Sequence, residues 1–137
     1  MIEQLFRQHA QYEKMSVVDV YHHLLMPEML GRLVHYNTPE GPIAFTWTRP
    51  TTGQSIEKLM SGTADMDLWV DHHPDTGRTP WIVDVAGGPG VSGNEIGRFL
   101  RWAVVEEGIA YDGQKVLFHR SSGIKTGRIG FFTARGL

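Results

Sequence analysis

The run that most constrains the fold is residues 81–86, Trp-Ile-Val-Asp-Val-Ala, which is apolar on both faces of an extended strand except at Asp84. Such a strand is typical of the middle of a sheet that is covered on both sides. In a regular strand Asp84 shares a face with Ile82 and Ala86. An ionised carboxylate among apolar neighbours is costly unless it is paired or hydrogen-bonded. We therefore expect Asp84 to be largely buried at the end of a central strand, where it orients a partner such as histidine or only accepts backbone N–H groups.

A glycine-rich turn, residues 87–93, follows this strand and leads into a helix with Ser92 and Glu95 at capping-box spacing. A turn of this kind gathers unpaired N–H groups at a helix N-terminus, which suits a phosphate or pantetheine-type ligand. The alternative is a wide turn whose glycines are needed for positive φ. We expect the turn to face the same cleft as Asp84. The candidate ligand-binding residues are Gly87, Gly88, Gly90, Val91, Ser92 and Gly93.

The remaining patterns predict an α+β domain. Ser16 can cap a helix in which Asp19 is the third residue, and Pro27 should kink or end that helix near Met26. The other expected helices are residues 2–14, a turn or two at 54–60, and 94–107; the expected strands are 33–36, 42–48, 67–71, 81–86, 115–119 and 128–134, with a glycine-containing turn between the last two. This order predicts one layered domain over residues 1–137, with a central mixed sheet flanked by helices.

Composition narrows the function classes. The chain has no cysteine, which excludes disulfides and thiolate chemistry, and no apolar run approaches the roughly 20 residues that span a bilayer. We expect a cytoplasmic protein with no membrane partner. Nothing resembles a nucleic-acid patch of interleaved basic and aromatic residues, and the histidine spacing fits no standard metal site. Residues 1–97 carry a net charge of −6 and residues 98–137 a net charge of +4, so the C-terminal third could face an acidic partner.

Three short stretches resemble the RTX toxin-activating lysine acyltransferases. Thr76-Gly77-x-x-x-Trp81-Ile82-Val83-Asp84 is similar to that family's Ser-Gly-Asp-Arg-x-Trp-hydrophobic-Ile-Asp. Pro42-Ile-Ala-Phe45 resembles its Pro-Val-Ala-Tyr strand, and Leu25-Met-Pro27 with Gly31 resembles its Leu-Pro helix. The expected helix 94–107 and the two terminal strands follow in the family's order, so the resemblance spans roughly residues 12–134 in short matches.

The resemblance implies a fold similar to the GNAT-type N-acyltransferases. It also implies transfer of an acyl group from acyl carrier protein or coenzyme A to a protein lysine, with no tightly bound cofactor. The family relies on an Asp and a His, and Asp84 matches the Asp. Counting back from Pro27 without gaps places the family's His at Glu13, so the candidate base is Glu13 or one of the histidines His9, His22 and His23, of which we prefer His23. The glycine turn would hold the phosphopantetheine arm, and Arg98 and Arg101 would attract an acidic carrier protein.

A second hypothesis assigns the chain to a different class, a protein that is not an enzyme. The chain also resembles small proteins of tailed phages, so it could be a non-catalytic GNAT-like interaction or virion-associated protein, with a homodimer as one arrangement. Glu13 at the family's His position favours this reading. Asp84 and the glycine turn favour the enzyme.

Overall fold

The computed structural model describes residues 2–9, 12–119 and 127–136 and has an α+β fold with one mixed sheet. The strands lie in sequence order: β1 Leu33–Thr38, β2 Gly41–Thr48, β3 Trp81–Gly87, β4 Lys115–His119 and β5 Ile129–Thr133. Neighbours are antiparallel except β3 and β4, which are parallel. The predicted fold class is confirmed, and the arrangement is consistent with a GNAT-like layered fold. As expected, β3 is the central strand.

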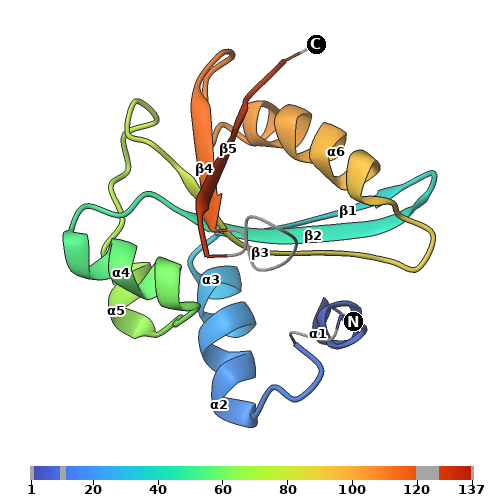
Figure 1. Ribbon diagram of the computed structural model, residues 1–137, viewed down its shortest axis with the longest axis horizontal. Coiled ribbons are helices and arrows are strands. Elements are labelled where there is room, and N and C mark those ends of the chain that lie inside the picture. Colours follow the sequence, from blue (N-terminus) through green and yellow to red (C-terminus); the bar gives the residue numbers. More distant parts are fainter. Residues whose placement is uncertain (1, 10–11, 120–126, 137) are drawn as a thin grey trace.

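Helices cover the two faces of the sheet unequally (Figure 1). The longest helix, α6 Gly93–Glu106, lies across one face. The other face carries short pieces: α1 Ile2–Arg7, α2 Val17–Val20, the π-helical turn η1 Tyr21–Leu25, α3 Met26–Met29, α4 Gly53–Ser61 and α5 Met66–Val70. None of the helices in the described part of the chain is both long and apolar enough to cross a bilayer.

The elements on the α6 side of the sheet closely match those predicted from the sequence. Ser92 and Glu95 form the predicted capping box, and the helix ends before Gly108, whose φ of 71° is a left-handed conformation that favours glycine. The apolar stripe of α6 packs against the sheet through four buried side chains: Phe99, Leu100, Ala103 and Val104. The predicted hairpin β1–β2 and the helix at 54–60 also form.

Two expectations about elements were wrong. The first helix stops at Arg7 instead of continuing to residue 14, because the chain turns so that Tyr12 packs edge-on against Phe6, with ring centroids 5.2 Å apart. Instead of the expected strand at 67–71, the chain forms the helix α5 Met66–Val70, because the Asp65 side chain accepts a hydrogen bond from the N–H of Leu68 and caps it. A short apolar run does not by itself distinguish a strand from a helix.

The parallel pairing of β3 with β4 is brief. Only Trp81 with Leu117 and Ile82 with Phe118 are paired, after which the strands separate, and β4 and β5 turn steeply away from β1–β3 (Figure 1). This separation leaves room for a cavity beside the central strand. The turn predicted between β4 and β5 lies outside the described residues.

Candidate active site

Asp84 faces the short helices because the pairing of β3 with β2 contains an irregularity. Thr46 pairs with Asp84 and the next residue, Trp47, pairs with Ile82, so Val83 has no partner. An extra residue of this kind re-aims the side chains on one side of it. Ile82 packs in the core beneath α6, whereas Ala86 packs against α1 on the opposite face. The prediction that Asp84 shares a face with Ile82 was therefore wrong, while its burial is confirmed, at 7% exposure.

His23 reaches Asp84 from the π-helical turn. Its Nδ1 lies 3.0 Å from Asp84 Oδ2, and the His23 side chain is 18% exposed. A π-turn inserts an extra residue into a helix and often occurs at functional sites. The helix passes through Pro27 and continues to Met29, so the expected break near Met26 becomes this wider turn. Because Pro27 has no N–H to donate, the carbonyl of His22 is left for the indole N–H of Trp69, at 2.6 Å.

Tyr12 completes the polar group around Asp84. The Tyr12 hydroxyl donates a hydrogen bond to Asp84 Oδ1 at 2.8 Å, while the Asp84 N–H donates to Thr46 Oγ1 at 3.2 Å. The two carboxylate oxygens therefore have different partners, His23 on one and Tyr12 on the other. This arrangement satisfies the buried carboxylate and fixes its orientation.

The environment raises the pKa of His23 above its usual value. Burial of the ring lowers the pKa, but the hydrogen bond and negative charge of Asp84, together with the charge of Asp19, outweigh that effect. With Nδ1 directed at Asp84, Nε2 is the ring nitrogen that can exchange a proton with a substrate. His23 and Asp84 thus have the geometry of a general base and the carboxylate that orients it.

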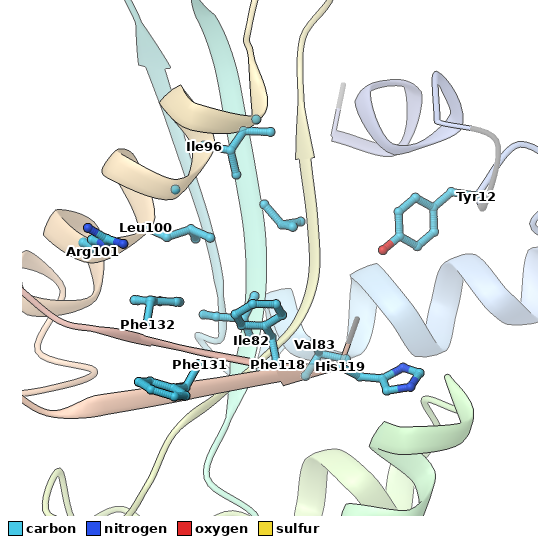
Figure 2. A pocket seen from close by; sticks show the side chains of 13 residues that line it. Tyr12, Ile82, Val83, Ile96, Leu100, Arg101, Phe118, His119, Phe131 and Phe132 are labelled. Carbon is cyan, nitrogen blue, oxygen red and sulfur yellow. The ribbon is translucent and has the colours of Figure 1, made fainter. Parts of the chain in front are cut away.

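Two cavities adjoin near this pair, and only the polar one is lined by His23 and Asp84. A polar cavity of about 480 Å³ is lined by His23, Asp84, Asp19 and Lys14, among others. An apolar cavity of about 430 Å³ lies between β3, β4 and α6 and is lined mainly by Ile82, Val85, Ile96, Leu100, Phe118 and Phe132. Figure 2 shows its apolar side chains gathered between β4 and α6, with Arg101 on the α6 side and Tyr12 opposite. Tyr12, Val83 and His119 line both cavities.

The glycine turn is shaped mainly by packing. A Cβ at Gly88 would lie 2.8 Å from Pro42 Cδ, and one at Gly90 would lie 2.7 Å from the carbonyl of Glu40. The Gly88 N–H donates to the Pro42 carbonyl, and the Val91 N–H donates to Gly88. None of the six candidate residues has positive φ. Gly88 and Gly90 are therefore needed because the turn passes close to the β1–β2 hairpin, and not for a positive φ.

The turn does not share the cavity of Asp84, contrary to expectation. Of the six candidates, only Gly93 lines a cavity described here. It lines the apolar cavity and a neighbouring groove, but not the polar cavity. Gly87 packs against Val91 and Ile96, and Ser92 is occupied by the capping box with Glu95. Asp84 also lies in the middle of β3 rather than at its end.

The other candidate bases are placed elsewhere. Glu13 is exposed and lines neither cavity, and its carbonyl accepts a hydrogen bond from Arg7. His9 Nε2 lies 3.0 Å from the carbonyl of Gly87, and His22 stacks edge-on with Tyr21. Among the candidates, the structure brings only His23 to Asp84.

Sequence reasoning singled out neither Tyr12 nor His119 as a site residue. Neither has a local signal, because each reaches the site only through tertiary packing. Gly97 was also missed, although a usable signal existed. It lies inside α6, four residues after Gly93, where glycine costs up to about 1 kcal/mol relative to alanine. A Cβ at either position would meet no atom within 4 Å, and both glycines line the apolar cavity and the adjoining groove.

Within residues 2–9, 12–119 and 127–136, no three His, Asp or Glu side chains are grouped so as to hold a metal ion. No protein-family model and no curated protein matches the sequence.

Proposed function

We propose that this chain is an N-acyltransferase that moves an acyl group from a thioester of acyl carrier protein or coenzyme A to a protein lysine, as its resemblance to the toxin-activating acyltransferases implies. The observation that carries the proposal is the 3.0 Å contact of His23 Nδ1 with Asp84 Oδ2 in the polar cavity, which shares Tyr12, Val83 and His119 with the apolar cavity. The chain has no cysteine, so the acyl group passes to the amine without a cysteine thioester.

The polar cavity suits the acceptor amine. Asp84 and Asp19 are carboxylates that attract a lysine ammonium, and hydrogen bonds from Ser16 keep the pKa of Asp19 below its usual value. His23 Nε2 takes a proton from the amine, and Asp84 stabilises the imidazolium that forms. Tyr12 holds the second carboxylate oxygen, so that Oδ2 stays directed at His23.

The apolar cavity suits the donor. Its lining of aliphatic and aromatic side chains accommodates an acyl or pantetheine chain, and Val83, Tyr12 and His119 lie where it adjoins the polar cavity. The neighbouring groove contains Arg98 and Arg101 together with Gly93, Asn94 and Gly97 at the N-terminal half of α6. Arginines beside a helix N-terminus favour the phosphate of a phosphopantetheine arm and the acidic surface of a carrier protein.

A non-catalytic interaction protein, including one associated with a phage virion, is the second candidate. A row of exposed apolar residues on the helical segment 17–30 favours it: Val17, Val18, Tyr21, Leu25, Met29 and Leu30. Large apolar patches of this kind mark contacts with other proteins. This surface and the cavities lie on different residues, so one assay separates the two candidates.

The test is acyl transfer from octanoyl-coenzyme A and octanoyl-acyl carrier protein to a lysine-containing peptide, followed by mass spectrometry. His22→Ala and His23→Ala form a matched pair, because the residues are neighbours and only His23 lies at Asp84. We expect His23→Ala to lose about 100-fold or more in kcat, the usual contribution of a general base, and His22→Ala to transfer like the parent.

Equal activity of the two variants would remove His23 as the base. No transfer by the parent from either donor would instead favour the interaction protein.

A further inference from the structure

One lysine of the chain lies in the acceptor cavity. Lys14 lines the polar cavity together with His23 and Asp84, in the turn that follows Tyr12. The backbone on either side is anchored: the Tyr12 hydroxyl binds Asp84, and the Met15 N–H donates to the Tyr12 carbonyl at 3.2 Å. The Ser16 N–H is held by Asp19. Lys14 is therefore attached to the cavity wall, with a long flexible side chain that is largely exposed.

The other lysines that the structure describes are differently placed. Lys58 Nζ lies 3.0 Å from Asp65 and 3.6 Å from Asp67, and Lys115 Nζ lies 4.7 Å from the ring centre of Phe131. Neither lines the polar cavity. Within the described residues, no hydrogen bond or ion pair engages the Lys14 ammonium. Lys14 is thus the described lysine that combines a free amine with proximity to His23.

We propose that Lys14 is a site of self-acylation, in which the chain transfers the acyl group to its own amine. This inference rests on the proposed acyltransferase function. The deprotonated Lys14 Nζ attacks the thioester carbonyl carbon, a C–N bond forms and the C–S bond breaks. The sulfur leaves with the bonding electron pair. His23 takes the proton from the attacking nitrogen and passes it to the thiolate, so the products are an amide and a free thiol.

The geometry favours this reaction over random labelling. Holding an amine beside the base and the donor converts a bimolecular step into an effectively unimolecular one. The amide carries no charge, so the reaction also removes a cation from the acceptor cavity and places an acyl chain near it. Self-acylation would then compete with the external acceptor for the same space.

The test is incubation of the full chain with octanoyl-coenzyme A or octanoyl-acyl carrier protein in the absence of a peptide, followed by peptide mapping. We expect one octanoyl group, on Lys14, with a first-order rate that does not change on dilution of the protein. His23→Ala should slow labelling of Lys14 by about 100-fold or more. Lys58→Arg should be labelled like the parent, and Lys14→Arg should lose the label.

Mixing His23→Ala with Lys14→Arg distinguishes transfer within a chain from transfer between chains. Faster labelling of Lys14 on the His23→Ala chain in this mixture than in His23→Ala alone would overturn the self-acylation inference, as would equal labelling of Lys14 in parent and His23→Ala. Transfer to an added peptide with no label on Lys14 would overturn this inference and leave the acyltransferase function standing. No transfer to either amine would overturn both.

Discussion

The two faces of the sheet are built in different ways. On one face a single uninterrupted helix, α6, buries a continuous apolar stripe against the strands. On the other face the segment from α1 to α3 is divided into short pieces, and His23 and Tyr12 converge from them on Asp84. A regular helix maximises apolar contact. An interrupted one can direct polar groups at a single buried carboxylate. We infer that the α6 face supplies a continuous apolar core and part of the proposed donor cavity, whereas the opposite face holds the proposed base and its carboxylate.

Asp84→Asn should have the largest effect of the variants considered. It should lower the rate of acyl transfer and leave the fold unchanged. The Asn amide can still accept from Tyr12, but it donates an N–H to His23 Nδ1, which places the ring proton on Nε2 and removes the base. We expect kcat to fall by about 10²–10⁴-fold, with donor binding and the circular dichroism spectrum unchanged. Steady-state acyl-transfer kinetics measure this. Asp67→Asn, at a largely exposed position, is the control. Unfolding of Asp84→Asn would contradict the separation of the two faces.

Phe99→Ala should have the opposite effect: it should lower the stability of the fold and leave the rate of acyl transfer nearly unchanged. Phe99 lies on the buried face of α6 and contacts the rings of Tyr36, Phe45 and Trp102, so truncation leaves a cavity. We expect a loss of about 3–5 kcal/mol in the free energy of unfolding, measured by urea denaturation. Met29→Ala, at an exposed position on the other face, should change it by about 0.5 kcal/mol or less.

The kcat per folded molecule of Phe99→Ala should stay near that of the parent. A tenfold loss in this quantity would show that the α6 face also controls the chemistry.

The pH dependence of kcat tests whether His23 is the base on the face opposite α6. The base must be neutral, so kcat should fall with acidity, approaching tenfold per pH unit below the raised pKa of His23. In Asp84→Asn the inflection should move to lower pH, because the partner that raises the pKa has lost its charge. Two measurements test this shift: the pH profile of the residual rate of Asp84→Asn, and NMR titration of the His23 ring in that variant. An unchanged His23 pKa in Asp84→Asn would contradict the assignment.

Stability should respond to His23 and His72 with opposite signs. Because the folded-state pKa of His23 is raised, its pairing with Asp84 contributes fully below the unfolded-state pKa, and this contribution is lost as pH rises through the folded-state value. Burial and the positive charges of Arg32 and Arg49 lower the pKa of His72 to about 4, so protonation of the unfolded chain destabilises the fold as pH falls from about 6.5 toward 4. NMR titration of both rings in the parent should show the two opposite shifts.

Much of the fold could be predicted because its signals are local. The β1–β2 hairpin, the capping boxes at Ser16 and Ser92, the stripe of α6 and the central strand around Asp84 each follow from a few neighbouring residues. The carboxylate itself could also be identified, since an isolated Asp in an apolar strand is costly wherever the strand lies. The choice of His23 over Glu13 was only a preference at that stage.

Tertiary structure decided the rest. The unpaired Val83 turns Asp84 toward the short helices, and the π-turn before Pro27 carries His23 to it. Gly88 is required by the ring of Pro42 and Gly90 by the carbonyl of Glu40, both in the β1–β2 hairpin far earlier in the sequence. Sequence alone determined most of the elements and which carboxylate needs a partner, because helix caps, periodicity and turns depend on near neighbours. It determined neither the end of α1 nor the helical form of α5. Only the folded chain decided which side chains meet, because a one-residue shift in pairing reverses the direction of a side chain and leaves no local signal.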